Sequence, residues 1–172
     1  KVARTRTEVK KALNQKLILV NGKEAREEKN SLLLFDTLSL VPSKKYYRLV
    51  LTNTGKFELE EIKENETNKK VAKVVDKKIL KGKKVQLNLS DGKNFLSDVA
   101  CKMNDSVLID LKNKKIEKCL PLKEKARVIV FQGKHTGEMG IIEKIDEEKK
   151  MVKISEKDKS IKVLIKQVMV ME

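Results

Sequence analysis

Short stretches in which apolar and polar residues alternate recur along most of this chain. From Tyr46 onward these stretches are separated by turn sequences such as Asn53-Thr-Gly55 and Ser90-Asp-Gly92. Alternation with a period of two, interrupted by glycine- and asparagine-containing turns, predicts β-strands joined into hairpins. We therefore expect a mainly β protein.

The first part of the chain has a different pattern. An apolar stripe at helical spacing, together with a capping-box pattern at Thr5 and Glu8, predicts a helix over residues 5–15. A short apolar strand follows and ends in a turn at Asn21-Gly22, a pair that favours tight hairpins. This segment is expected to form a small α+β element.

The last part of the chain has the strand content of a small barrel. Five short alternating stretches follow Pro121, which marks a boundary. Five strands in about 50 residues are typical of an SH3-like barrel. We therefore expect three domains: an N-terminal element at 1–41, a central β-rich domain at 42–121 and a C-terminal barrel at 122–172.

Charge indicates the class of partner. The 172 residues carry a formal charge of +15, and the pI is about 9.7. The excess is concentrated in residues 1–23, with a net of +6, and in 69–84, with a net of +7, whereas 122–172 hold only +3. Such patches attract polyanions. Aromatic residues make up only 3% and Trp is absent, which argues against binding by base stacking.

The sequence offers few residues from which a catalytic site or a metal site could be built. Cys101 and Cys119 lack CxxC spacing, and His135 is the single histidine, so no metal and no cofactor are expected. No nucleophile stands with a base, so we expect no enzyme. The two cysteines are expected to be reduced, inert core residues. No apolar run is long enough to span a membrane. Because residue 1 is Lys, the numbering is expected to start inside a longer natural chain.

The loop between two apolar stretches at 128–131 and 139–145 is rich in glycine. Gly133, Gly137 and Gly140 allow tight turns and close approach. Lys134 and His135 are expected to lie exposed at the tip of the loop. This pattern resembles the KOW motif, a strand–loop–strand unit of ribosomal proteins and transcription elongation factors. The resemblance implies that the loop contacts RNA or a neighbouring protein. The alternative is a plain hairpin turn in a barrel.

The N-terminal segment resembles the RNA-binding fold of bacterial small-subunit ribosomal protein S-four. The resemblance rests on the Arg/Glu-containing helix, the stretch Val20-Asn-Gly-Lys23 and the later Asp36. It implies that five cations contact phosphates. Such contacts fix the position of the protein along the RNA without reading the bases. The five cations are Arg4, Arg6, Lys10, Lys11 and Lys23. The first helix of that family would precede residue 1. The alternative is a basic helix face that is merely solvated.

The order of the parts resembles the archaeal and eukaryotic small-subunit ribosomal protein four of the e type. Supporting stretches are Phe35–Leu40, Tyr47–Val50 with Gly55–Phe57, and Met103–Lys112. The resemblance implies a structural constituent of the small ribosomal subunit that supports translation in the cytoplasm. Its partners would be small-subunit ribosomal RNA and neighbouring ribosomal proteins, with the chain present as a monomer. The many lysines and few glycines of the central region favour an archaeal member.

The lysine-rich segment 69–84 is expected to place its apolar residues against a core and its lysines outward. The apolar residues are Val71, Val74, Val75, Ile79 and Leu80. The lysines either face RNA or protect an edge strand from pairing. The candidate RNA contacts here are Lys69, Lys70, Lys73, Lys77 and Lys78.

Two other classes of function remain open at this stage. An RNA-modifying enzyme would need a catalytic domain that the hairpin-rich region after residue 42 is too small to supply. A transcription or translation factor that uses its KOW barrel to bind a protein partner is the stronger alternative.

Overall fold

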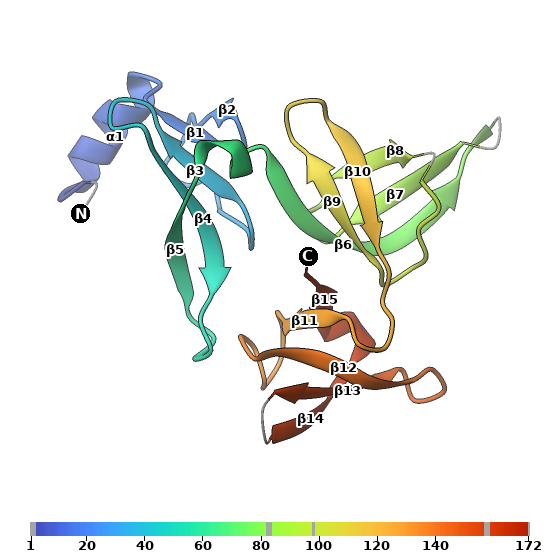
Figure 1. The fold of residues 1–172 in the computed structure, drawn as a ribbon. Helices are drawn as coiled ribbons and strands as arrows, with labels where there is room; N and C mark the ends of the chain where they lie inside the picture. The colour runs from blue at the N-terminus through green and yellow to red at the C-terminus, as the bar shows by residue number, and fades with distance from the viewer. Residues whose placement is uncertain (1–2, 82–83, 98, 157–158, 172) are drawn as a thin grey trace. The chain divides into compact units, whose positions relative to one another are not determined.

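The computed structural model describes residues 3–81, 84–97, 99–156 and 159–171. Within these residues it has three five-stranded antiparallel sheets and one short α-helix near the N-terminus (Figure 1). The expectation of a mainly β protein with an N-terminal helix is confirmed. By its contacts the chain divides into two compact units. The first unit contains Lys1–Val50, Glu58–Lys70 and Leu111–Asn113, and the second contains Leu51–Phe57, Val71–Asp110 and Lys114–Glu172.

The first sheet has the strand order β2-β1-β3-β4-β5 and follows helix α1. Its elements are α1 (Arg6–Asn14), β1 (Ile18–Val20), β2 (Lys23–Glu24), β3 (Thr37–Leu40), β4 (Lys45–Leu51) and β5 (Phe57–Ile62). The predicted turn at Asn21-Gly22 joins β1 to β2, and both residues have positive φ, at 51° and 72°. This is the conformation that an Asn-Gly hairpin turn favours. The tip of the β4–β5 hairpin belongs to the second unit.

A buried polar cluster fixes the connection between β1 and β3. Asp36 accepts hydrogen bonds from Asn21 Nδ2 at 2.8 Å and from the backbone N–H of Leu33 at 2.8 Å. Asn21 Oδ1 in turn accepts the N–H of Thr37 at 3.1 Å. Asn21 and Asp36, two of the residues on which the family resemblance rests, therefore hold the local backbone in place.

The second sheet has the order β10-β9-β6-β7-β8 and forms the central region. Its strands are β6 (Lys69–Ile79), β7 (Val85–Leu89), β8 (Asn94–Ser97), β9 (Ser106–Asp110) and β10 (Lys115–Leu120). The short helix η1 (Glu64–Glu66) precedes β6. Val74, Leu87, Val107 and Ile109 are completely buried in it.

Strand β6 departs from the expected pattern of valines inward and lysines outward. A bulge between Val74 and Asp76 shifts its pairing with β7, so Val75 is 53% exposed. Beyond the bulge, Ile79 lies at the end of the hairpin and is 73% exposed. An extra residue in one strand reverses which side chains face each side of the sheet. The expectation that Val75 and Ile79 pack into a core was therefore wrong.

The third sheet is a half-barrel with the order β14-β13-β12-β11-β15. Its elements are β11 (Arg127–Val130), β12 (Met139–Asp146), β13 (Met151–Glu156), β14 (Lys159–Leu164), η3 (Ile165–Gln167) and β15 (Val168–Val170). The apolar core includes Val128, Ile142, Val152 and Val168, each at most 1% exposed. All five strands expected after Pro121 are present.

Three hydrogen bonds join the second sheet to η3 and β15 inside the second unit. The Lys73 ammonium, on β6, donates to the carbonyl oxygens of Ile165 at 2.7 Å and Val168 at 2.6 Å. Ser106 Oγ, on β9, accepts the N–H of Val170 at 2.9 Å. These bonds satisfy polar groups that the packed sheets would otherwise bury unpaired.

No helix among the described residues has the length and apolar character needed to cross a membrane.

Candidate nucleic-acid interface

Helix α1 presents most of the predicted phosphate-binding residues. Its N-cap is Thr5, whose Oγ1 accepts the N–H of Glu8 at 3.3 Å, and the Glu8 carboxylate accepts the N–H of Arg4 at 2.7 Å. Leu13 is the buried anchor of the helix. The predicted capping signal therefore marks the start of the helix, although Glu8 reaches back to Arg4 rather than to Thr5.

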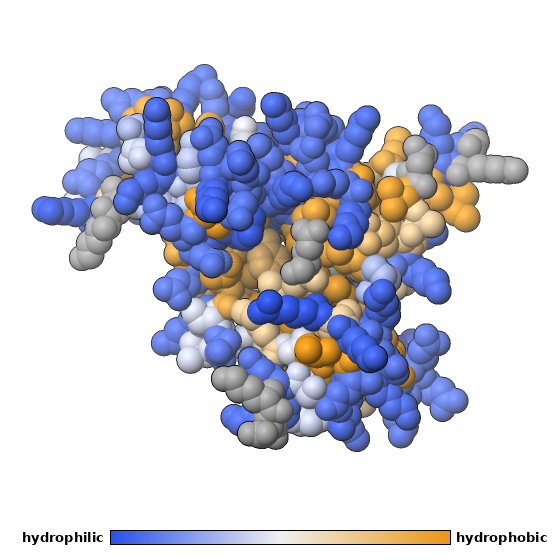
Figure 2. Space-filling model, viewed as in Figure 1, coloured by the Kyte–Doolittle hydropathy of each residue, from blue (hydrophilic) through white to orange (hydrophobic). Residues whose placement is uncertain are grey.

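The cations of this region are exposed to solvent. Arg4, Arg6, Lys10 and Lys11 all lie on the exposed surface of the helix or just before it. Lys23 is exposed on β2, an edge strand of the first sheet. In Figure 2 hydrophilic side chains dominate the visible surface over this part of the chain. Exposed cations on a fixed scaffold can contact the phosphates of a nucleic acid.

An acidic residue outside the predicted site binds two of these cations. The Glu28 carboxylate receives Arg6 Nε at 2.9 Å and is also bonded to the terminal guanidinium nitrogen of Arg6. Lys10 Nζ lies 3.8 Å from Glu28 Oε1. Hydrogen bonding to Arg6 lowers the pKa of Glu28, and the same contact raises the pKa of Arg6. Both groups are therefore charged at neutral pH.

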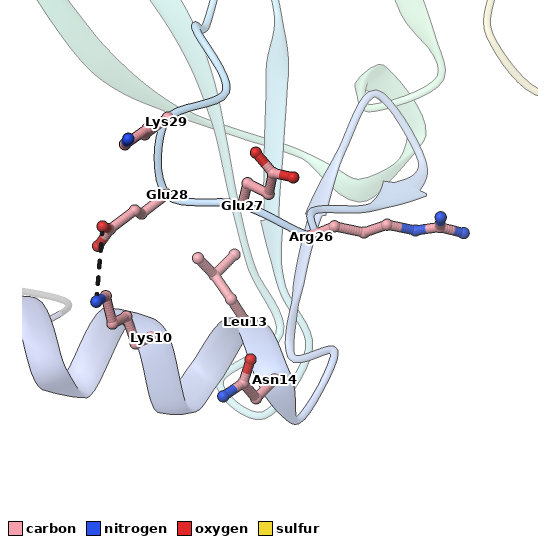
Figure 3. A pocket seen from close by; sticks show the side chains of 7 residues that line it. All are labelled: Lys10, Leu13, Asn14, Arg26, Glu27, Glu28 and Lys29. Carbon is pink, nitrogen blue, oxygen red and sulfur yellow. Dashed lines mark ion pairs between the residues drawn. The ribbon is translucent and has the colours of Figure 1, made fainter.

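Glu28 belongs to the loop between β2 and β3, which faces α1 across a cleft of about 320 Å³ (Figure 3). In this view Glu28 points toward Lys10, whereas Arg26 points away from the helix. The cleft is lined by Lys10, Leu13, Asn14, Arg26, Glu27, Glu28 and Lys29. Glu28 was not among the site residues predicted from the sequence. Two consecutive acids close to a strongly basic segment were the available signal.

The lysines of β6 fall into two groups. Lys69, Lys77 and Lys78 are exposed, but Lys70 and Lys73 are only 2% and 3% exposed. Lys70 bonds to Asp36 and Lys73 to backbone carbonyls, so neither ammonium can reach RNA in this conformation. The assignment of these two lysines to an RNA surface is corrected to a structural role. Gly82 and Lys83 of the 69–84 segment lie outside the described residues.

Burial changes the acid–base behaviour of Lys73. Desolvation lowers its pKa to about 8, although the nearby charge of Asp105 acts in the opposite direction. A buried ammonium loses its hydration, and two carbonyl oxygens replace only part of it.

The glycines of the KOW-like loop lie close to other parts of the chain, although Gly133 is exposed. A Cβ on Gly137 would clash with the Thr52 carbonyl oxygen, at the tip of the β4–β5 hairpin. A Cβ on Gly133 would lie 2.5 Å from the side chain of Gln167, and one on Gly140 would lie 2.5 Å from the Ser155 carbonyl oxygen. Close packing against backbone therefore accounts for the absence of side chains at Gly137 and Gly140, whereas Gly133 has a positive φ of 93° that favours glycine.

At the tip of this loop, Lys134 is exposed but His135 is not fully so. The His135 side chain is 33% exposed, and its Nδ1 lies 3.1 Å from Glu138 Oε1. The expectation of a freely exposed histidine is corrected by this contact. Lys134 remains the available cation of the loop.

Asp105, which directly precedes β9, gathers backbone N–H groups and a thiol around its carboxylate. Asp105 accepts the N–H groups of Lys102 at 2.8 Å and Leu122 at 2.9 Å, and it also receives the Cys119 thiol. Cys101 is buried, and burial raises the pKa of both thiols. Among the described residues, no group of three or more His, Cys, Asp and Glu side chains could hold a metal ion.

Comparison with known proteins gives a consistent family. The model of "Ribosomal family S4e" matches residues 43–116. The small ribosomal subunit protein eS4 of Nanoarchaeum equitans is 34% identical over 144 residues, which are 84% of this chain and 62% of that protein. The protein of the same name from Methanocella arvoryzae is 34% identical over 145 residues, 84% of this chain and 61% of its own. The chain thus spans about three fifths of the length of these relatives.

A solved structure supports the fold. The crystal structure of the 30S ribosomal protein S4e from Thermoplasma acidophilum superimposes with a TM-score of 0.81 at 24% sequence identity. The match covers 95% of this chain and 84% of that one.

Proposed function

The chain belongs to ribosomal family S4e, and we propose that it is a non-catalytic structural component of the small ribosomal subunit. It binds small-subunit ribosomal RNA through exposed cations and contacts neighbouring ribosomal proteins. It does so as a monomer within the cytoplasmic ribosome, and it needs no cofactor. Its relatives carry the name of a small-subunit protein, which supports this assignment.

The observation that carries the proposal is the exposed group of cations on and beside α1. Arg6, Lys10 and Lys11 lie within two turns of helix, Arg4 lies just before its N-cap, and Leu13 anchors the helix to the protein. Four cations on one short element can contact several phosphates of a folded RNA at once. Each contact releases counterions, which makes binding favourable and sensitive to salt.

Further contacts are proposed from exposed residues of the second unit. Lys77 and Lys78 follow the bulge of β6, and Lys134 lies at the tip of the KOW-like loop. Lys23 and Lys69 of the first unit complete the set. Half-buried His135, which follows Lys134 in the sequence and bonds to Glu138, is also proposed as a contact. Within each unit the sheets carry these groups on a folded scaffold.

The three segments predicted from the sequence are retained as a functional division. We propose that 1–41 is the S-four-type RNA-binding element, 42–121 the central domain and 122–172 a KOW-type, SH3-like barrel. The short helix η3 between β14 and β15, and the pairing of β15 with β11, support the barrel assignment. Strands β4 and β5 of the central segment extend the sheet that begins in the N-terminal one.

Sedimentation with purified small ribosomal subunits tests the proposal. We expect the chain to sediment with subunits stripped of their own copy of this protein, and to remain bound in high KCl. Large subunits serve as the control and should not retain it. Release at moderate salt, or equal binding to both subunits, would favour a factor that uses its KOW barrel to bind a protein.

A further inference from the structure

We propose that Glu28 is an internal competitor for RNA phosphate, occupying the anion-binding position that Arg6 and Lys10 form on α1. This inference rests on the proposed function, because it concerns the regulation of the same surface. In the free protein the carboxylate holds this position, and in the complex a phosphate replaces it. The loop that carries Glu28 therefore limits which RNAs can bind.

The geometry of the contact supports this exchange. Arg6 holds both carboxylate oxygens of Glu28, through Nε and a terminal nitrogen of the guanidinium. A guanidinium binds a phosphate with the same two-pronged arrangement. This edge of Arg6 cannot hold the carboxylate and a phosphate together. Lys10 Nζ approaches Glu28 Oε1, so the Lys10 ammonium also binds either the carboxylate or a phosphate.

Accessibility allows a phosphate to reach the position. The Arg6 side chain is 72% exposed, whereas the Glu28 side chain is 19% exposed. An incoming anion therefore meets the guanidinium from the solvent side. The cleft between α1 and the Glu28 loop leaves space into which the carboxylate can withdraw (Figure 3).

The position of Glu28 in its loop allows the side chain to move. Glu28 lies between β2 and β3 and belongs to neither strand. Backbone hydrogen bonds flank it on either side: the N–H of Ala25 donates to the Ile18 carbonyl at 3.0 Å, and the N–H of Asn30 donates to the Glu27 carbonyl at 3.3 Å. Moving the Glu28 side chain therefore breaks the contacts with α1 without disturbing the sheet.

The competition has a consequence for selectivity. Exposed ion pairs are weak, so an RNA that also contacts Arg4, Lys11 and the other cations displaces Glu28 easily. An isolated anion that meets only Arg6 and Lys10 gains little from the exchange. Glu28 thus reduces binding to anions that lack the remaining contacts.

The test compares Glu28→Gln with Glu27→Gln, which removes the same charge one residue away. Glu27 is exposed and is in no ion pair among the residues that the structure describes. Binding to total small-subunit ribosomal RNA is measured by filter retention over a KCl series. We expect Glu28→Gln to bind about two- to five-fold more tightly than Glu27→Gln, with a salt slope steeper by about 0.7–0.9.

A third arm assigns the gain to Arg6 and Lys10. In an Arg6→Ala/Lys10→Ala background, Glu28→Gln should bind no more tightly than Glu27→Gln. Equal affinities of the two variants in the wild-type background, or weaker binding by Glu28→Gln, would overturn the inference. Failure of the unaltered chain to bind this RNA would instead contradict the proposed function.

Discussion

Lys70 and Asp36 form a buried ion pair within the first unit. Lys70 Nζ lies 2.6 Å from Asp36 Oδ1, and the two side chains are 1% and 6% exposed. Asp36 also accepts bonds from Asn21 and Leu33, so its carboxylate has several donors. The pair links the first residues of β6 to the turn that precedes β3. A lysine from the most basic segment of the chain thus stabilises the fold rather than binding RNA.

Replacing Lys70 should therefore destabilise the protein strongly. Lys70→Met leaves the Asp36 carboxylate buried without its cation, and loss of one partner of a buried pair costs about 3–5 kcal/mol. Urea unfolding measures the change. Lys78→Met, on the exposed part of the same strand, is the control and should change the free energy of unfolding by less than about 0.5 kcal/mol. Adding Asp36→Asn to Lys70→Met removes the unpaired carboxylate and should recover part of the loss. Similar stabilities of Lys70→Met and Lys78→Met would contradict the structural role of Lys70.

The KOW-like loop should be intolerant of a side chain at Gly137. Gly137 and Gly92 both have positive φ, at 94° and 77°, but a Cβ on Gly92 would meet nothing within 4 Å. Gly92→Ala should therefore cost only the backbone strain, about 1 kcal/mol. Gly137→Ala also meets the Thr52 carbonyl and should cost roughly 1–3 kcal/mol more. Urea unfolding of the two variants gives the comparison. Equal costs would show that the packing against Thr52 has no energetic weight.

Burial of Lys73 should make stability depend on pH in alkaline solution. Its pKa is about 8 in the folded chain, against 10.5 for an ordinary lysine. Between these values the unfolded chain binds more protons at this site, so the free energy of unfolding rises with pH. We expect wild type to gain stability relative to Lys73→Met from about pH 8 to about pH 10.5. A difference that stays constant across this window would show that the ammonium is not desolvated.

The two cysteines should react slowly in the native protein. Burial raises the pKa of Cys101 and Cys119, and the thiolate is the reactive form. Alkylation by iodoacetamide at pH 8 should therefore be slow in buffer and fast in guanidinium chloride. Mass spectrometry follows both sites. Rapid modification of the native chain would mean that the β9–β10 region opens more readily than its contacts indicate.

Local patterns were sufficient to predict much of this fold. The turn at Asn21-Gly22 and the five strands after Pro121 follow from short-range signals of residue type and alternation. These signals act over a few residues, so they can be interpreted without knowing the tertiary structure. The Thr5 cap is a further example.

Contacts between distant residues explain what the sequence did not reveal. Lys70 meets Asp36 across 34 positions, and Glu28 meets Arg6 across 22. The bulge beside Val75 changes which side chains of β6 are buried, and no local pattern marks it. Charge composition therefore located the basic segments correctly but could not separate structural lysines from exposed ones.

RNA binding by the cations of α1 underlies the proposed function. Affinity for small-subunit ribosomal RNA, measured over a salt series with duplex DNA as competitor, tests it. An Arg4→Ala/Arg6→Ala/Lys10→Ala/Lys11→Ala variant is compared with a control in which four exposed lysines of the C-terminal half-barrel are replaced by Ala (Lys144, Lys149, Lys162 and Lys166).

We predict tight, DNA-resistant binding by the unaltered chain. Its salt slope should flatten by about 0.7–0.9 for each phosphate-binding cation of α1 that is replaced, and it should flatten much less in the control. Equal effects of the two variants, or equal binding to DNA, would contradict RNA recognition by α1. The charge of the chain would then act as a general attraction to polyanions.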